Sequence, residues 1–536
     1  MHDGQAPLDA VVVGAGFSGL YMIKRLCDAG FTVQGIEAAP SVGGTWYWNA
    51  YPGARCDVES FDYCYSFSRE LEEEWNWSER YPAQPELLRY LNHVADRFDL
   101  RRHFAFETRV VSADWDEARK LWNVRCDRGD AIQCRHFILA GGAISVPKPP
   151  EIDGIESFGG ECYHTGHWPQ TPVDFAGKRV AVIGTGSSGV QTTTAIVDQV
   201  AQLTVFQRTA NFTAPILNRP LAPGELDAFR RTSAERHERS RHSRQGIPYP
   251  MPTETALGAS PEAREAKYRE AWDNSHLFAL RLTYADLMID EAANDTVAEF
   301  VRGKIGELVK DSQVAERLTP RGFPFATKRP CIGKGYYEMF NRHHVHLVDV
   351  NRTPIVRMTP RGIETTEGEM GFDMVIFATG FDALTGAAAR IAITGKRDLS
   401  LRETWADGPQ TYLGVATSHF PNLWLVTGPG SPGPLTAMVK TIEQHVDWIA
   451  DCLIWMRQHG YATIAADEAR QAEWMDHVQE VADATLYPRA DSWYVGANVP
   501  GKPRRFMPYL GGLGAYRAKC DAIAVAGYEG FTFTPA

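Results

Sequence analysis

Two glycine-rich segments are the first places in this sequence where residue types and spacing suggest chemistry. Gly14-Ala15-Gly16-Phe17-Ser18-Gly19 follows the apolar run Asp9 to Val13 and precedes an expected helix, Leu20 to Ala29. In such a unit the glycines permit a tight turn, a close approach to a pyrophosphate and close helix–strand packing. Glu37 ends the next expected strand, Thr32 to Glu37, where a carboxylate can accept hydrogen bonds from ribose hydroxyls. A structural turn is the alternative, but the whole pattern favours a dinucleotide site.

The same pattern returns later in the chain with one change of charge. Gly184-Thr185-Gly186-Ser187-Ser188-Gly189 follows the expected strand Arg179 to Ile183 and precedes a helix that starts at Val190. The next expected strand, Gln202 to Phe206, is followed by Gln207-Arg208-Thr209, so that an arginine replaces the acid. A guanidinium can bind a ribose 2′-phosphate with two hydrogen bonds, whereas a carboxylate would repel it. The second site therefore indicates NADP rather than NAD, unless Arg208 is an ordinary surface arginine.

The two sites together narrow the class of protein, although either site alone would fit many functions. An acid in one and an arginine in the other indicate FAD that is reduced by NADPH. Two apolar segments, Phe137 to Gly142 and Met374 to Gly380, resemble the two domain crossings of two-dinucleotide flavoproteins. We therefore expect an α/β protein with two Rossmann-like domains. Residues 1–141 and 380–536 would form the FAD-binding domain, and 142–379 an inserted NADP-binding domain with a helical insertion at about 215–322, including helices over 223–239 and 261–274.

Composition limits the remaining classes. The chain has 536 residues, 44% of them hydrophobic, which is ordinary for a soluble protein and long for one core. A net charge of −11 argues against a nucleic acid or an anionic membrane as the partner. No long apolar run predicts membrane insertion, and the polar stretch Met1 to Asp9 predicts no signal peptide. Nine cysteines without a C-x-x-C pair or zinc-like spacing predict free thiols in the cytoplasm, no metal site and no disulfide reductase. No feature indicates an oligomeric state.

A third segment, just before the second glycine motif, separates the subclasses. Residues 158–169 match the pattern F-x-G-x-x-x-H-x-x-x-W-P at Phe158, Gly160, His164, Trp168 and Pro169. This pattern is typical of Baeyer–Villiger monooxygenases, whereas N-oxygenating flavin monooxygenases usually lack the Trp-Pro ending. We expect these five residues, called the fingerprint below, to position the connection between the domains. We assign no proton transfer to His164.

The chain resembles the type I Baeyer–Villiger monooxygenase family, such as the phenylacetone and steroid monooxygenases, along nearly its whole length. Segments 43–49, 51–57, 327–329, 336–338, 380–383 and 492–498 carry this resemblance. Beyond the two motifs, the resemblance implies contacts with FAD from Gly44, Thr45, Trp46, Trp48, Asp57, Tyr63 and Val110. It implies contacts with NADP from Gln191, Arg208, Thr209, Lys328, Arg329 and Trp493. Tyr63, Val110 and Trp493 would look no different as packing residues.

The resemblance also implies a mechanism. NADPH reduces FAD, O2 forms a flavin peroxide, and this peroxide attacks an apolar ketone to give an ester or lactone. Arg329 matches the family's active-site arginine, and an arginine suits a peroxide anion because it stays charged and has no readily lost proton. Asp57 matches the carboxylate that positions this arginine, although an Asx-type turn would explain the same residue.

Segment 428–438 resembles the family's loop beside the flavin, where the ketone is expected to bind. Gly433-Pro434 stands where phenylacetone-type enzymes tend to carry Ser-Ala. Proline fixes its own φ and restrains the residue before it, while glycine removes a side chain. We therefore expect Pro434, Leu435 and Met438 to shape the substrate wall, unless the segment is only a structural turn.

Two other functions stay open from the sequence. An N- or S-oxygenating flavin monooxygenase would carry the same two nucleotide sites, and it differs in whether a ketone yields an ester. A flavin-bearing binding or redox-sensing protein without turnover is the other alternative. Arg329 and the complete NADP site argue against a protein without turnover. A measurement of NADPH consumption would separate such a protein from a monooxygenase.

Overall fold

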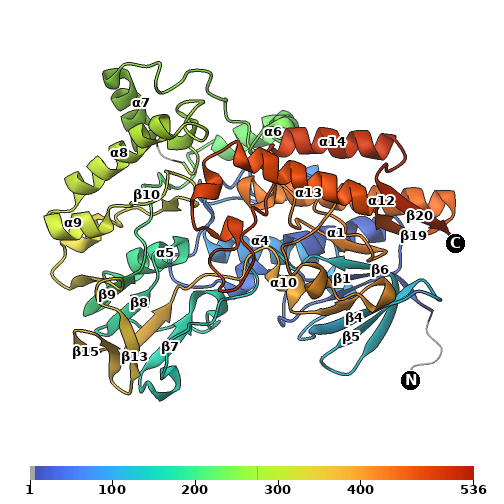
Figure 1. The fold of residues 1–536 in the computed structure, drawn as a ribbon, viewed down its shortest axis with the longest axis horizontal. Helices are drawn as coiled ribbons and strands as arrows, with labels where there is room; N and C mark the ends of the chain where they lie inside the picture. Colours follow the sequence, from blue (N-terminus) through green and yellow to red (C-terminus); the bar gives the residue numbers. More distant parts are fainter. Residues whose placement is uncertain (1–5, 275) are drawn as a thin grey trace.

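Two mainly parallel β-sheets, one toward each side of Figure 1, organise the chain. The computed structural model describes residues 6–274 and 276–536; Met1–Gln5, part of the stretch predicted to lack a signal peptide, lie outside these ranges. Strand order in the first sheet is β17-β4-β5-β6-β1-β2-β3, and β18 pairs with β6. Its strands are β1 (Leu8–Val13), β2 (Val33–Ile36), β3 (Phe104–Ala105), β4 (Val110–Asp116), β5 (Leu121–Cys126), β6 (Ala131–Leu139), β17 (Ala392–Thr394) and β18 (Leu423–Leu425).

The second sheet is parallel throughout, in the order β12-β9-β8-β16-β7. Its strands are β7 (Glu161–His164), β8 (Arg179–Ile183), β9 (Gln202–Gln207), β12 (Val345–Asp349) and β16 (Met374–Phe377). The strand before each glycine motif lies inside its sheet. Strand β1 lies between β2 and β6, and β8 lies between β9 and β16, where β6 and β16 are the strands that lead into the two crossings. Such strands are buried on both faces, which explains apolar runs such as Ala10-Val11-Val12.

Helices cover these sheets and form a separate group at the top of Figure 1. The chain carries α1 (Phe17–Asp28), α2 (Thr45–Trp48), α3 (Arg69–Glu74), α4 (Gln84–Arg97), α5 (Ser187–Ile196), α10 (Gly386–Ala389), α11 (Leu401–Thr404), α12 (Met438–His459), α13 (Glu468–Asp483) and α14 (Leu513–Val525). The helical insertion holds α6 (Glu225–His242), α7 (Pro261–Asp273), α8 (Glu291–Leu308) and α9 (Ser312–Leu318). Across residues 6–274 and 276–536, no helix combines the length and apolarity needed to cross a membrane.

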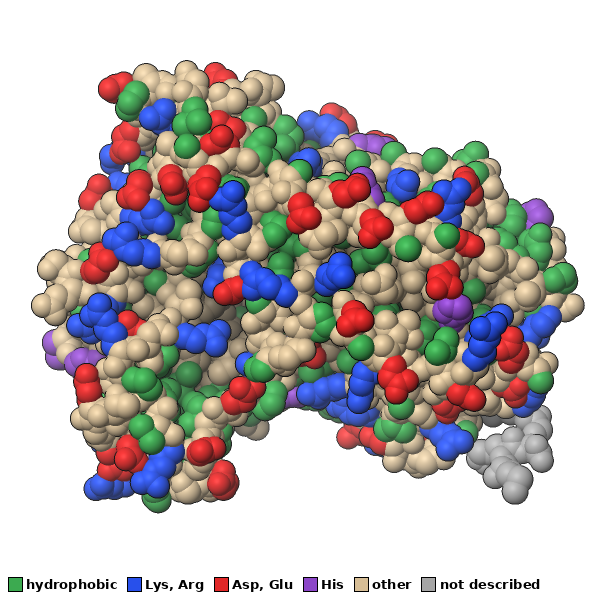
Figure 2. All heavy atoms as spheres, viewed as in Figure 1, with side chains coloured by type: hydrophobic (Ala, Val, Ile, Leu, Met, Phe, Trp, Pro, Cys, Tyr) green, Lys and Arg blue, Asp and Glu red, His purple; other side chains and the backbone are tan. Residues whose placement is uncertain are grey.

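Short strands complete the fold. They are β10 (Thr213–Ala214) with β11 (Cys331–Ile332), the antiparallel group β13 (Ile355–Thr359), β14 (Gly362–Thr365) and β15 (Gly368–Gly371), and β19 (Tyr461–Ala466) with β20 (Phe531–Pro535). The predicted α/β class with two Rossmann-like units and a helical insertion is confirmed. Figure 2 shows that the surface is indented along its lower edge, between the lobes that carry the two sheets.

The predicted element boundaries differ by a few residues from those observed. Helix α1 begins at Phe17 rather than Leu20, and α5 begins at Ser187 rather than Val190, because Gly16 and Gly186 act as N-caps and the motif residues after them form the first turn. Strand β2 is shorter than predicted, at Val33–Ile36, and α6 runs three residues beyond 239.

The two crossings between the sheets run side by side as an antiparallel pair. The backbone N–H of Lys148 donates to the carbonyl of Gly380 at 2.9 Å, and Asp382 N–H donates to Val146 at 2.9 Å. Leu384 N–H donates to the carbonyl of Ala143 at 2.8 Å. Because the two connections hold each other, the sheets are joined by a paired strap rather than by two independent linkers.

Candidate active site

The first glycine motif is pressed against the end of strand β6. Gly14 has a φ of 108°, and a Cβ atom there would lie 2.7 Å from the carbonyl oxygen of Ala140. A Cβ atom on Gly19 would overlap the carbonyl of Gly14 and push α1 off the turn. At Gly16 a Cβ atom would lie 3.4 Å from the Cα of Gly44, so the segment 43–48 closes over this turn. Both the turn and the helix packing therefore require glycine.

The second motif repeats this geometry. Gly184 has a φ of 117°, and a Cβ atom there would overlap the carbonyl of Ala378, which follows β16 as Ala140 follows β6. A Cβ atom on Gly189 would overlap the carbonyl of Gly184. Around Gly186, by contrast, no atom lies within 4 Å of an added Cβ, so this part of the turn faces open space. The open turn and the N-terminus of α5 fit a pyrophosphate.

Glu37 lies at the end of β2 and is buried. One carboxylate oxygen accepts from the N–H of Ala15 and the other from the N–H of Ala39, each at 2.7 Å. Burial raises the pKa of Glu37, whereas these backbone donors lower it. Each carboxylate oxygen retains a lone pair that a ribose hydroxyl can use.

Tyr63 and Trp46, two of the other residues expected to contact FAD, pack together beside the first motif. Tyr63 packs against Phe17, with ring centroids 5.3 Å apart, and against Trp46 at 5.9 Å. Thr45, Trp46 and Trp48 lie on the short helix α2, and Trp48 meets the ring of His167 at 5.2 Å. Val110 is buried at the start of β4. Phe17 and Ser18 are buried in the first turn of α1.

Two cations lie beside the second motif. Arg208 and Thr209 are exposed just after β9, and the Thr185 hydroxyl donates to the carbonyl of Thr209 at 2.8 Å. The Lys328 ammonium lies 4.7 Å from the centroid of the Phe323 ring. Burial lowers the pKa of Lys328, Asp491 raises it, and Arg208 lowers it again. Arg208 and Lys328 are thus close enough to repel each other, as expected of a pair that shares one phosphate.

Residues of the second motif also contact the first half of the chain. The Gln191 side chain accepts from the Tyr51 hydroxyl at 2.8 Å and donates to the carbonyl of Arg55 at 3.1 Å. Ser187 and Ser188 lie in the first turn of α5, and the Ser188 hydroxyl accepts from Thr165 at 3.3 Å. The two contacts of Gln191 hold the second motif against the segment 51–57, which includes Asp57, a residue expected to contact FAD.

Arg329 and Asp57 form a bidentate ion pair at this junction. Nε and Nη2 of Arg329 donate to the two carboxylate oxygens of Asp57, each at 2.8 Å, and Nη1 donates to the carbonyl of Pro434 at 2.8 Å. The Arg329 side chain remains 23% exposed. A guanidinium carries five N–H groups, so two remain beyond the three that bind Asp57 and Pro434, and the Tyr494 side chain lies beside them. Burial lowers the pKa of Arg329, but Asp57, together with Tyr494, raises it overall, and the group stays charged.

The fingerprint links the paired crossings with the segment around Trp48. His164 Nδ1 accepts from the N–H of Gly166 at 2.9 Å, so its proton is on Nε2, which lies 3.1 Å from the carbonyl of Lys148 and 3.0 Å from the Thr379 hydroxyl. Burial lowers the pKa of His164, which favours this neutral form. The backbone N–H of Trp168 donates to the carbonyl of Trp48 at 3.1 Å. His164 thus bonds to both crossings.

Phe158, Gly160 and Pro169 complete the fingerprint. A Cβ atom on Gly160 would lie 2.5 Å from the carbonyl of Asp373, and the half-buried Phe158 packs against the apolar residues behind β16. Pro169 is half-buried after the buried Trp168 and lines a pocket together with Pro85 and Leu88 of α4.

The predicted substrate residues belong to the segment whose Pro434 carbonyl accepts a hydrogen bond from Arg329. Pro434 and Leu435 belong to a short 3-10 helix, Gly433–Leu435, and Leu435 is buried in an apolar cluster that includes Tyr494 and Phe506. Trp493 packs against this cluster. Trp493 and Met438 also pack against a smaller group that contains Ala143 and Met507. The Pro434 carbonyl therefore joins the predicted substrate wall directly to Arg329.

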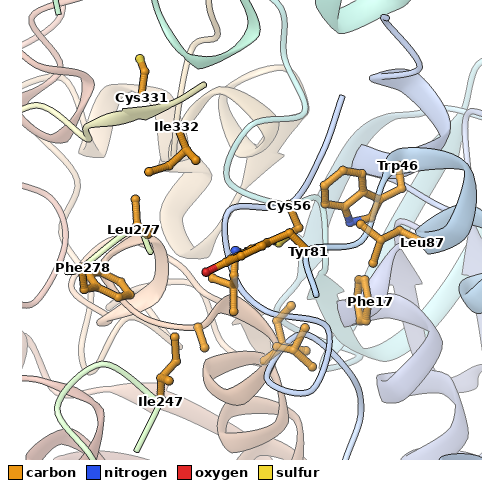
Figure 3. Packing of buried hydrophobic residues seen from close by; sticks show 14 of the residues in the cluster. Phe17, Trp46, Cys56, Tyr81, Leu87, Ile247, Leu277, Phe278, Cys331 and Ile332 are labelled. Carbon is orange, nitrogen blue, oxygen red and sulfur yellow. Dashed lines mark hydrogen bonds between the residues drawn. The ribbon is translucent and has the colours of Figure 1, made fainter. Parts of the chain in front are cut away.

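A large apolar cluster extends from the first motif into the helical insertion. Figure 3 shows Phe17, Trp46 and Leu87 on one side of Tyr81, and Ile247, Leu277 and Phe278 on the other. Cys331 and Ile332, which lie two and three positions after Arg329, and Cys56, which precedes Asp57, belong to the same cluster. The chain segments next to both members of the ion pair are therefore anchored in one apolar cluster.

Two Rossmann-like units with matched glycine turns, an acid in one and cations in the other, define a flavoprotein that takes FAD and NADP(H). The residues present fit both groups, because each turn is closed to side chains on its sheet side and the Gly186 turn is open to a ligand. All nine cysteines are free thiols in the described structure.

Comparison with known proteins defines the family. Residues 11–238 match the family described as pyridine nucleotide-disulphide oxidoreductase. A Baeyer–Villiger monooxygenase of Pseudooceanicola batsensis is 42% identical over 98% of this chain and 96% of its own, and cyclohexanone 1,2-monooxygenase of Acinetobacter sp. is 39% identical over the same shares. The structure of an oxidized steroid monooxygenase bound to NADP has a TM-score of 0.95 and 47% identity, covering 99% of this chain and 100% of its own.

The chain belongs to the type I Baeyer–Villiger monooxygenase family. It is an enzyme that depends on FAD and NADPH, and the cofactors expected from the two glycine motifs are confirmed.

Sequence reasoning missed two partners of Arg329. One is the carbonyl of Pro434, and the other is Tyr494, a buried residue beside Trp493 that raises the pKa of Arg329. A backbone carbonyl has no residue signature, so no pattern could have identified the first. The second could have been found from its position next to Trp493 in segment 492–498.

Proposed function

We propose that this enzyme converts apolar ketones into esters or lactones with O2, and that Arg329 is the group that acts on the reacting oxygen. One observation carries the proposal: a charged guanidinium, fixed by Asp57 and by the carbonyl of Pro434, has two N–H groups that neither of them uses, and it lies next to chain segments anchored in a large apolar cluster. A low-polarity environment strengthens the interaction of such a charge with developing negative charge.

Each part of the site then has a chemical task. The residues around the first glycine motif would hold FAD, which would supply the chemistry of accepting a hydride from NADPH and passing electrons to O2. The remaining N–H groups of Arg329 stabilise negative charge on oxygen without losing a proton, because arginine remains charged at any physiological pH. Asp57 and the Pro434 carbonyl orient the guanidinium plane. Leu435, with Met438 and Trp493, limits the access of water and contacts the apolar part of the ketone.

We further propose which residues hold each cofactor and where the domains divide. FAD is held by Gly14, Gly16, Phe17, Ser18, Gly19, Glu37, Gly44, Thr45, Trp46, Trp48, Asp57, Tyr63 and Val110. NADP is held by Gly184, Thr185, Gly186, Ser187, Ser188, Gly189, Gln191, Arg208, Thr209, Lys328, Arg329 and Trp493. Residues 1–141 and 380–536 form the FAD-binding domain and 142–379 the NADP-binding domain, a division supported by the strand membership of the two sheets. The free thiols support a reducing compartment such as the cytoplasm.

A product screen tests the proposed function. The protein with FAD and NADPH is incubated with linear, cyclic, aromatic and steroidal ketones under ¹⁸O2, and products are identified by mass spectrometry. We expect an ester or lactone that carries one ¹⁸O atom, and no such product from Arg329→Ala. NADPH consumption without any ester from any ketone would overturn the proposal.

A second candidate function has one specific observation in its favour. A relative from Lysobacter antibioticus, 38% identical over 528 residues, is named a phenazine N-monooxygenase. Aromatic amines and sulfides therefore belong in the same screen. An N-oxide or sulfoxide as the sole oxygenated product would favour this alternative.

A further inference from the structure

The loop that carries Pro434 begins at a residue in an unusual backbone conformation. Thr427 has a φ of 57°, in the left-handed region that β-branched residues rarely adopt. Leu413, beside it in space, also has a φ of 57°. The two turns are joined, because the N–H of Gly428 donates to the carbonyl of Gly414 at 3.1 Å. Thr427 and Leu413 are both buried, so neighbouring groups must hold these backbone angles in place.

A chain of three hydrogen bonds connects these two residues. The N–H of Thr427 donates to His445 Nδ1 at 3.0 Å. The proton of His445 is therefore on Nε2, which donates to the Tyr516 hydroxyl at 2.8 Å. That hydroxyl donates in turn to the carbonyl of Leu413 at 2.6 Å. The direction of all three bonds is fixed by the first one, and every polar atom in the chain is satisfied.

The burial of this chain keeps its protonation state fixed. His445 is 1% exposed and Tyr516 is fully buried, with the two rings stacked 5.5 Å apart. Burial lowers the pKa of His445 to about 3, so the ring stays neutral and its Nδ1 stays an acceptor.

His445 also connects the residue before the loop to the helix that follows the loop. Thr427 precedes the loop, and α12, which carries His445, starts at Met438 where the loop ends. Between these points the N–H of Gly430 donates to the carbonyl of Met507 at 2.7 Å, and the carbonyl of Pro434 accepts from Arg329. A change in the backbone direction at Thr427 would therefore move the carbonyl that Arg329 contacts.

We propose that His445 and Tyr516 are positioning residues that hold Thr427 and Leu413 in their left-handed conformations and thereby fix the path of the loop 428–438. Through that path they place the Pro434 carbonyl on Arg329 and Leu435 in the substrate wall, and so they set the choice between ketones. The role in selectivity rests on the proposed function, whereas the hold on the loop does not.

The variant Tyr516→Phe tests this inference, because it removes the hydroxyl and keeps the buried ring. We expect the ratio of kcat/KM between a cyclic and a linear ketone to change by roughly tenfold, which corresponds to about 1.4 kcal/mol. The rate of FAD reduction by NADPH should stay near that of the parent. Hydrogen–deuterium exchange should become faster in the segment 427–437 and remain unchanged in the helical insertion.

A matched control is Tyr268→Phe. Tyr268 is also buried, and its hydroxyl makes a 2.7 Å hydrogen bond to Thr296 in the helical insertion. This variant should lose a comparable amount of thermal stability while its ketone ratio and the exchange of 427–437 stay unchanged. An equal change of the ratio in both tyrosine variants would mean that lost stability, rather than loop position, alters selectivity, and would overturn the inference.

Two further variants cover a failure of Tyr516→Phe to fold. In His445→Asn the side-chain oxygen can still accept from Thr427 but does not reach Tyr516, so we expect the same change of ratio and the same local exchange. Thr427→Gly should keep or raise Tm, because glycine takes a positive φ without strain. A lowered Tm in Thr427→Gly, or unaltered exchange of 427–437 in the folded variants, would overturn the inference. If the parent oxygenates no ketone, the proposed function fails, while the exchange measurement still decides whether His445 and Tyr516 hold the loop.

Discussion

Replacing Arg329 by alanine should do more than remove one positive charge, because it leaves the carboxylate of Asp57 without its partner. An anionic oxygen about 4 Å from the guanidinium gains roughly 4 kcal/mol at an effective dielectric near 20. Asp57 lies on the far side of the guanidinium, and at about 7 Å it opposes this by roughly 2.4 kcal/mol. The net stabilisation in the parent is thus about 2 kcal/mol, whereas Arg329→Ala loses the full 4 kcal/mol, or about three decades in rate.

These interaction energies predict an order for the rates of ester formation among the variants. The double variant Asp57→Ala/Arg329→Ala loses only about 2 kcal/mol relative to the parent, so its rate of ester formation should exceed that of Arg329→Ala by roughly fiftyfold. Asp57→Ala alone should gain from electrostatics, so any loss of rate in this variant measures the positioning of Arg329. Ester formation is followed by gas chromatography, with stopped-flow reduction of FAD by NADPH as the control for cofactor binding. A double variant no faster than Arg329→Ala would refute the electrostatic argument.

Four other predictions follow from the structure. Arg208→Ala and Lys328→Ala each remove a charge-assisted partner worth about 1.5 to 3 kcal/mol, so KM should rise for NADPH by roughly ten- to a hundredfold and barely for NADH; equal effects on both coenzymes would contradict the assignment. Glu37→Ala should purify with little of the yellow, non-covalent FAD, and a normal flavin content per chain would disprove its role. His136 is a buried residue of β6, and burial lowers its pKa from 6.5 to about 3, so its contribution to stability is complete above pH 6.5 and is lost as the pH falls toward 3. Between these pH values His136 changes the free energy of unfolding by about 1.4 kcal/mol per pH unit. The free energy of unfolding, measured with urea at pH 7 and pH 5, should therefore depend less on pH in His136→Gln than in the parent. Leu435→Ala should change the ratio of kcat/KM among ketones while FAD reduction stays intact, and a uniform change would count against the substrate wall.

The fold could be predicted well where local patterns determine it. Both glycine turns, the strands before them and the helices after them follow from sequence, because tight turns and close helix packing exclude other residues at Gly14 and Gly184. The first turns of α1 and α5 were placed too late, since helix starts depend on which residue takes the cap conformation. The pairing of the two crossings also needed the structure, since it joins segments far apart along the chain.

The candidate site was predicted in residue type but not in its contacts. The pairing of Arg329 with Asp57 was expected only from the resemblance, and the two residues are 272 positions apart. The contact with Pro434 spans 105 positions and involves only a backbone carbonyl. Likewise, the sequence offers no sign that Thr427 would adopt a positive φ, because β-branched residues disfavour it and only the buried partner His445 makes it tenable.

The three partners in the Arg329 site come from three different sections of the chain. Asp57 belongs to the first section of the proposed FAD-binding domain, Arg329 to the inserted NADP-binding domain, and Pro434 to the last section. Asp57 and Pro434, both in the proposed FAD-binding domain, therefore orient the guanidinium of an arginine that belongs to the proposed NADP-binding domain. Any motion that separated the two proposed domains would break these hydrogen bonds or change the position of Arg329. The orientation of the charge thus depends on contacts between the two proposed domains, and His164 of the fingerprint bonds both of the crossings that join them.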